Sequence, residues 1–228
     1  MALAYGISAT PLGLQKIGAA PEQAERFTHV QVCFPLAEDS RFHLHETLHA
    51  LRAAFPALTF SFRVCPQTNL CDPMPAVRGA WLEETARIAA LCKREGGLFT
   101  VIPCGMIWGE GAPLPQRRGR ALSLLADSLE ALCDRAETGK LVLESAVLPP
   151  SAALLPLGTP DDLLFLLDAV WNDRLGLCLH GTENDLRLPA REWVCVRPRP
   201  DAEALSELLR KSESLPQPIW VITPNTAV

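Results

Sequence analysis

The sequence lacks the features that would place this protein in a membrane or on nucleic acid. It has no apolar run of about 18 residues, the length that spans a bilayer, and its first residues lack the charged and then apolar order of a secretion signal. The net charge is -5 and the pI is near 5.6, so no excess of positive charge is available for phosphate backbones or anionic lipids. We therefore expect a cytoplasmic protein with neither a nucleic-acid partner nor a membrane partner.

The sequence also lacks a Cys-x-x-Cys pair, although it contains eight cysteines. That spacing is typical of structural zinc sites, and its absence argues against one here. Most of the cysteines lie within apolar strand or helix patterns, where a reduced thiol acts as a small hydrophobic side chain. These are Cys33, Cys92, Cys133, Cys178 and Cys195.

What the sequence does contain is one unit repeated along the chain: an apolar strand, a polar residue at its end, a loop and an amphipathic helix. Residues 140–145 show it most clearly, because this short apolar strand stops at Glu144 and turns into a proline-rich loop. Apolar residues make up 48% and charged residues 21%, which is typical of a globular protein with a sizeable core. We expect a single domain over residues 1–228.

Eight strands and six helices are predicted in alternation. The strands are residues 3–9, 29–34, 58–64, 98–102, 140–145, 175–179, 193–196 and 219–222, and the helices are residues 21–27, 41–55, 76–95, 117–137, 160–170 and 201–212. This order predicts an α/β fold, a (β/α)8 TIM barrel. The barrel is trimmed, because the helices after strands six and eight are short or missing. The wall left bare would be covered by loops or by a second copy in a homodimer.

Several motifs carry a family resemblance in chain order. The sequence contains Arg63-Val-Cys-Pro-Gln-Thr-Asn before a long helix, then Ile102-Pro-Cys-Gly, Leu143-Glu144, Gly176-Leu-Cys-Leu-His180 and Pro218 to Asn225. Together they resemble the xylose-isomerase-like barrels, a superfamily that includes type IV apurinic endonucleases and sugar isomerases and epimerases. The resemblance covers most of the chain. It implies that Glu144 stands where that superfamily has a metal-bridging carboxylate at the end of strand five.

The resemblance implies a divalent metal, zinc or manganese, but most ligand positions are changed. Only Glu144 keeps its place, and a metal would have to use Glu144, His180 and Glu183, which is a poor ligand set. The family's other ligand positions fall on Arg63, on Ile102 or Pro103, on His180 and Glu183, on Val196 or Arg197, and on Ile222. We therefore expect a degenerate metal site and no tightly bound cofactor.

Barrel active sites lie at the carboxyl ends of the strands, which gives a set of candidate site residues. The set comprises Ser8, Gln31, Arg63, Cys104, Glu144, His180, Glu183, Arg197 and Asn225. Two arginines suit a phosphate or a carboxylate, so we expect a small anionic, phosphorylated ligand. Glu144 is the candidate base and His180 the candidate proton carrier, whereas Cys104 could be a nucleophile only if its pKa were lowered.

Three functions remain open from the sequence. The first is a sugar-phosphate isomerase or epimerase, or a phosphoester hydrolase. The second comes from the superfamily, some of whose bacterial members hydrolyse the nucleotide-loop phosphoester of cobamides. The third is a non-catalytic binding or scaffolding barrel, in which Arg63 or Arg197 forms an internal salt bridge with Glu144 or Glu183.

Overall fold

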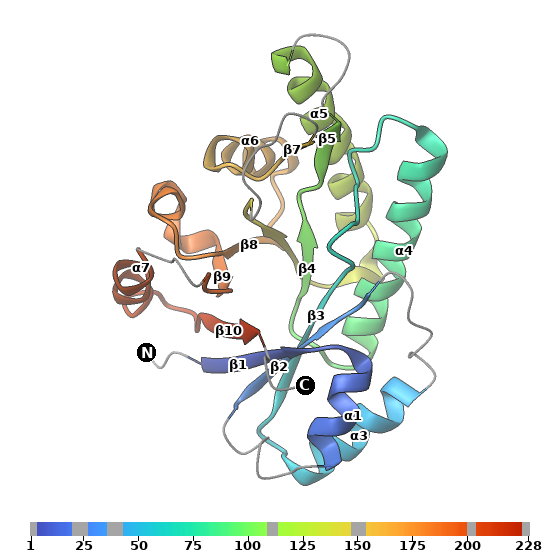
Figure 1. The fold of residues 1–228 in the computed structure, drawn as a ribbon, viewed down its shortest axis with the longest axis vertical. Coiled ribbons are helices and arrows are strands. Elements are labelled where there is room, and N and C mark those ends of the chain that lie inside the picture. The colour runs from blue at the N-terminus through green and yellow to red at the C-terminus, as the bar shows by residue number, and fades with distance from the viewer. Residues whose placement is uncertain are drawn as a thin grey trace.

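A computed structural model describes residues 4–19, 27–35, 43–108, 114–146, 154–199 and 204–224. Eight parallel strands among them close into a barrel (Figure 1). They are β1 (Ala4–Ala9), β2 (His29–Cys33), β3 (Thr59–Arg63), β4 (Thr100–Pro103), β6 (Leu141–Glu144), β8 (Leu175–Leu179), β9 (Trp193–Val196) and β10 (Trp220–Pro224). The barrel closes because β1 pairs with β2 on one side and with β10 on the other. The predicted TIM barrel is confirmed.

Helices cover the outside of this barrel (Figure 1). They are α1 (Pro11–Ala19), α3 (Leu44–Ala54), α4 (Pro75–Arg94), α5 (Leu114–Cys133), α6 (Pro160–Val170) and α7 (Leu205–Ser212), and the short 3-10 helix η2 (Ala136–Thr138) follows α5. Between β8 and β9 there are only two short 3-10 helices, η3 (Glu183–Arg187) and η4 (Ala190–Glu192). The predicted shortening after strand six is therefore confirmed. The segment after strand eight, residues 225–228, lies outside the described residues.

The barrel interior is packed with side chains of its own. A small apolar cluster fills it, apart from the larger core between the strands and the helices. Its members are Phe99, Val101, Val142, Cys178, Val194, Cys195 and Ile222. His29 lies at the same depth, with its ring nitrogens 2.8 Å from the Thr59 and Ser61 hydroxyl oxygens. As in other TIM barrels, this interior is a core rather than a channel, so a ligand can bind only at an end of the barrel.

Helix α1, which begins at Pro11 directly after β1, was not predicted. The helix that was predicted at residues 21–27 falls almost wholly outside the described residues. Proline suits the first helical position, and the Thr10 hydroxyl accepts a hydrogen bond from the Gly13 backbone N–H at 3.1 Å, which caps the helix. Residues 20–26 lie outside the described residues.

A second, two-stranded sheet was not predicted. It pairs β5 (Met106–Trp108), which follows β4, with β7 (Leu154–Pro156), which precedes α6, in antiparallel register. The backbone continues this pairing toward the barrel, because the Leu157 N–H donates to the Gly105 carbonyl at 3.0 Å. This sheet therefore stands beside the carboxyl ends of β4 and β6. Among the described helices, none combines the length and the apolar character that crossing a bilayer requires.

Candidate functional site

The carboxyl ends of four strands bring Arg63, Glu144, His180 and Arg197 together. Arg63 ends β3 and Glu144 ends β6, while His180 and Arg197 directly follow β8 and β9. Both Nε and Nη2 of Arg63 donate to Glu144 Oε2, at 3.1 and 2.6 Å, and Arg197 Nη1 donates to Oε1 at 2.9 Å. His180 Nε2 lies 3.5 Å from the same Oε1. These four residues are termed the Glu144 cluster.

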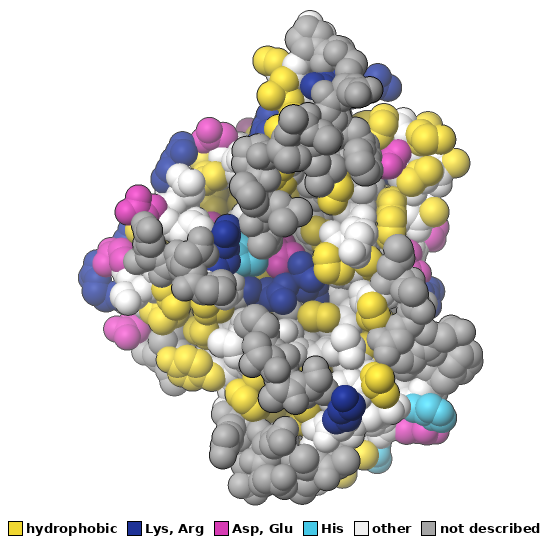
Figure 2. Space-filling view, viewed as in Figure 1, with side chains coloured by type: hydrophobic (Ala, Val, Ile, Leu, Met, Phe, Trp, Pro, Cys, Tyr) yellow, Lys and Arg dark blue, Asp and Glu magenta, His cyan; other side chains and the backbone are white. Residues whose placement is uncertain are grey.

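The Glu144 cluster is buried at the bottom of a hollow. Figure 2 shows basic, acidic and histidine side chains gathered near the middle of one face of the molecule. The exposed fractions of the side chains are 2% for Glu144, 5% for His180, 11% for Arg63 and 16% for Arg197. Charges so poorly hydrated are tolerated because each guanidinium is paired with the carboxylate.

The cations hold Glu144 in its charged form. Burial by itself raises the pKa of this carboxyl, but the contact with His180 and the charges of Arg63 and Arg197 outweigh it and hold the pKa well below its ordinary value. Burial lowers the pKa of Arg197, and the charge of Glu144 more than offsets this, so that pKa is raised. In this paired state Glu144 accepts a proton poorly. Its predicted role as a base therefore requires that an arginine be drawn away.

His180 is held in a defined orientation by the backbone around it. Its Nδ1 lies 2.8 Å from the Arg197 carbonyl oxygen, and since a carbonyl only accepts, Nδ1 carries a proton. Nε2 thus faces Glu144, and at 3.5 Å from Oε1 this contact is too long for a good hydrogen bond. The ring is positioned to exchange a proton at Nε2.

Asp185 was not identified from the sequence, and it supports His180 from behind. Its Oδ2 accepts hydrogen bonds from the backbone N–H groups of His180, at 3.0 Å, and Thr182, at 2.9 Å. The spacing Thr182-x-x-Asp185 is the signal that could have revealed it, because it matches a helix capping box. Glu183, the predicted site residue, is exposed on η3, while Asp185 is buried.

The other predicted residues lie at different depths. Gln31 is buried in the barrel interior, where its Nε2 donates to the Ser61 hydroxyl at 3.4 Å. Ser8, at the end of β1, donates to the Thr223 carbonyl at 3.4 Å. Cys33, which pairs with Arg63 across β2 and β3, was not predicted, and burial raises the pKa of its thiol. Asn225 lies outside the described residues.

The residues present do not fit a resident divalent metal of the kind that the resemblance implies. Both oxygens of Glu144 already accept hydrogen bonds from arginine. Glu183 is exposed on η3, and in the ranges that the structure describes no group of three or more His, Cys, Asp or Glu side chains could hold a metal ion. The three residues that a metal would have to use, Glu144, His180 and Glu183, are therefore not arranged as a metal site.

A cavity of about 220 Å³ opens beside the Glu144 cluster, between it and the β5–β7 sheet. Its lining residues are Arg63, Pro66, Pro103, Cys104, Gly105, Met106, Glu144, Ser145, Ala146, Pro156 and Leu157. Burial, with the nearby charges of Asp162 and Glu144, raises the pKa of the Cys104 thiol well above its ordinary value. Cys104 is thus a neutral wall residue, and the condition for its use as a nucleophile is not met.

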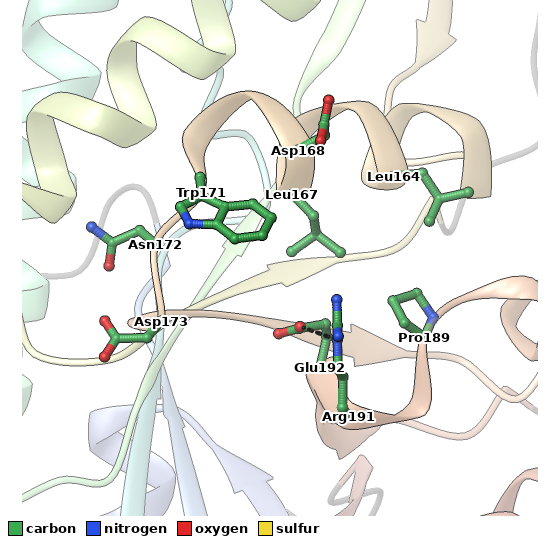
Figure 3. A pocket seen from close by; sticks show the side chains of 9 residues that line it. All are labelled: Leu164, Leu167, Asp168, Trp171, Asn172, Asp173, Pro189, Arg191 and Glu192. Atoms are coloured by element: carbon green, nitrogen blue, oxygen red, sulfur yellow. Dashed lines mark hydrogen bonds and ion pairs between the residues drawn. The ribbon is translucent and has the colours of Figure 1, made fainter.

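A larger cavity, of about 510 Å³, lies on the outside of the barrel between α6 and η4 (Figure 3). Two of its lining residues stand just before strands, Asp173 before β8 and Glu192 before β9. The cavity therefore lies at the amino ends of these strands. Active sites of barrels lie at the opposite end. We therefore assign the candidate site to the smaller cavity.

Comparisons with known proteins agree with this architecture. No protein-family model and no curated relative matches the sequence. Solved structures do match over nearly the whole chain. The chain shares the barrel fold of these structures.

Three of the matching structures show how far this likeness extends. A D-tagatose 3-epimerase-like protein matches with a TM-score of 0.72 and 15% identity, covering 97% of this chain and 91% of its own. D-psicose 3-epimerase from Clostridium cellulolyticum has a TM-score of 0.67 and 11% identity, over 97% and 85%. Endonuclease IV from Thermus thermophilus has a TM-score of 0.63 and 15% identity, over 96% and 91%. At such low identity the likeness is one of fold.

Proposed function

We propose that this protein is an enzyme that acts on a small anionic, phosphorylated molecule, by isomerisation, epimerisation or phosphoester cleavage, with arginines in place of a resident metal. One observation carries the proposal: Arg63 and Arg197 share a single carboxylate, Glu144. The three side chains together bear one net positive charge, and protonation of His180 adds another. A bound anion would balance this buried excess, and guanidinium groups suit phosphate oxygens.

Binding of the anion also supplies a route to catalysis. An anion that takes hydrogen bonds from Arg63 or Arg197 weakens their hold on Glu144. Burial then dominates and raises the pKa of the Glu144 carboxyl, so Glu144 becomes a base only when substrate is bound. His180, fixed by the Arg197 carbonyl, exchanges the second proton at Nε2. Paired proton transfers of this kind suit an isomerase or epimerase, and several proteins of the same fold are named as sugar epimerases.

The non-catalytic alternative is favoured by a specific observation. Every oxygen of Glu144 is engaged by an arginine, which is the internal salt bridge that the sequence left open. In that case the barrel binds the anion without converting it. The cobamide alternative gains less support, because the cavity lined by the described residues, of about 220 Å³, is small for a nucleotide loop.

Titration calorimetry with inorganic phosphate tests the anion site. We expect wild-type protein to bind phosphate and Arg197→Gln to bind it at least tenfold more weakly. The matched control is Arg187→Gln, since Arg187 is exposed and pairs with Asp161 on the surface. Absence of phosphate binding to the wild type would overturn the proposal.

Turnover of a panel of sugar phosphates and apolar phosphate monoesters, compared between the wild type and Glu144→Gln, separates the enzyme from the binding protein. We expect this variant to bind phosphate at least as tightly as the wild type, because the guanidinium groups lose their internal partner. Its turnover should fall by about 10² to 10⁴, the usual contribution of a general base. Phosphate binding by a wild-type protein that turns over no member of the panel would favour the non-catalytic alternative.

A further inference from the structure

We infer that the substrate carries an apolar body directly beside its anionic group, so that it is an amphiphilic phosphate monoester rather than a polyhydroxylated sugar phosphate. This inference rests on the proposed function, and it names the substrate class of the same site. It comes from the chemistry of the cavity wall, which is independent of the charges in the Glu144 cluster.

Few of the side chains that line the cavity are polar. Arg63, Glu144 and Ser145 supply its polar side chains, and Ser145 Oγ is buried without a hydrogen-bond partner among the described residues. The anionic group of a ligand in this cavity would contact Arg63.

The remaining wall is apolar. Its side chains come from Pro66, Pro103, Cys104, Met106, Ala146, Pro156 and Leu157. None of the described lining residues is aromatic, so these residues offer no ring on which a sugar face could stack. A sugar placed here would bury several hydroxyls without partners, and each would weaken binding. A carbon skeleton without hydroxyls loses no hydrogen bonds when it enters this cavity, and its removal from water favours binding.

The wall is also held in place before any ligand binds. The Asn69 side chain clamps the backbone of Met106, with Nδ2 donating to its carbonyl at 3.2 Å and Oδ1 accepting from its N–H at 3.1 Å. On the opposite side the Ala146 N–H donates to the Gly158 carbonyl at 2.8 Å, and the Gly158 N–H donates to Asp162. A wall fixed in this way selects a ligand by shape.

The size of the cavity limits the apolar body to about one six-membered ring. An apolar cavity of roughly 150 Å³ in an unrelated protein holds benzene. The volume here is about 220 Å³, which leaves room for the ring and for part of its phosphate. Phenyl phosphate is therefore a suitable probe.

Titration calorimetry on the full chain compares three probes: inorganic phosphate, ribose 5-phosphate and phenyl phosphate. We expect phenyl phosphate to bind at least tenfold more tightly than either of the others. Met106→Gln makes the wall polar at nearly constant shape, and it should remove most of this advantage, measured as the ratio of the phenyl phosphate affinity to the inorganic phosphate affinity. The matched control is Met74→Gln, because Met74 is exposed at the start of α4.

The wild-type comparison decides the outcome even if a variant does not fold. If inorganic phosphate binds and phenyl phosphate binds no more tightly, or if ribose 5-phosphate binds best, the inference is wrong while the proposed function stands. If none of the three anions binds, the proposed function fails and this inference fails with it.

Discussion

His29 lies in the barrel interior and Glu144 at the carboxyl end of β6, and burial disfavours the charged form of both. For His29 no nearby charge offsets the effect of burial. Its ring contacts hydroxyls and aromatic rings, and burial lowers its pKa from 6.5 to about 3. For Glu144 the neighbouring cations outweigh burial, so its pKa is also lowered. A lower pKa favours the charged form of a carboxyl, whereas it favours the neutral form of a histidine. One histidine is therefore a neutral core residue, while one carboxyl stays ionised.

The pKa of His29 predicts a pH-dependent stability. Below pH 6.5 the unfolded chain binds a proton that the folded chain binds only near pH 3. The contribution of this residue to the free energy of unfolding is therefore complete above pH 6.5, and it is lost as the pH falls from 6.5 to about 3. We expect the slope of unfolding free energy against pH, measured in urea between pH 6 and 5, to fall by about 1.4 kcal/mol per pH unit in His29→Gln.

The control for this measurement is His43→Gln, since His43 is exposed. Its slope should equal that of the wild type. Carboxyl groups titrate mostly below this pH range, so they contribute equally to all three proteins. Identical slopes for His29→Gln and the wild type would show that His29 is protonated in the folded protein.

For the residues of the site, the sequence predicts which side chains lie close together but not the hydrogen bonds between them. Arg63, Glu144, His180 and Arg197 come together because the carboxyl ends of parallel strands share one rim. The two-point contact of Arg63 with Glu144 depends on strand register, which spacing alone does not give. Ser145 was missed because its neighbour in the cavity wall, the β5–β7 sheet, forms by long-range pairing of three-residue strands.

Helix α6 carries two ion pairs of unequal value at its start. Arg118 of α5 binds Asp162, which is buried and also accepts hydrogen bonds from the Gly158 and Thr159 backbones. Arg187 binds Asp161, and both of these side chains are exposed. Loss of a partner costs most where the remaining charge is buried, because water does not replace the lost contact.

We expect Arg118→Gln to lower the free energy of unfolding by about 2 to 3 kcal/mol, since it leaves the buried carboxylate of Asp162 without its cation. Arg187→Gln, which removes the partner of the exposed Asp161 on α6, is the matched control and should change the free energy of unfolding by less than about 0.5 kcal/mol. Urea denaturation monitored by circular dichroism measures both. Equal effects would mean that the backbone hydrogen bonds alone satisfy Asp162.

The element boundaries follow the sequence closely where local signals are strong. Helix α6 matches its prediction residue for residue, because Thr159, Pro160 and Asp162 form a capping box with proline at the first position. Helix α1 was not predicted, because the cap that Thr10 supplies at its start was not recognised. Local patterns fix an element only when its cap is recognised.

At the scale of the whole molecule, the shortened connection between β8 and β9 leaves part of the outer wall open. The groove between α6 and η4 takes the place of a helix, and Trp171 at its edge is 81% exposed (Figure 3). This residue also has a φ of 37°, a left-handed conformation that costs energy for a bulky side chain. Leu164, which lines the same groove, is 39% exposed, and an apolar patch of this kind suits a surface that is covered in an assembly.

We propose that a second copy covers this face, and sedimentation velocity tests it. The wild type should have about twice the monomer mass of 24.9 kDa, and Trp171→Asn should shift it toward the monomer. Asparagine tolerates the left-handed backbone, so this change removes apolar surface without straining the chain. Tyr5→Ser, which removes another exposed ring, is the control and should leave the mass unchanged. A monomeric wild type at all concentrations would instead mean that the loops alone protect this wall.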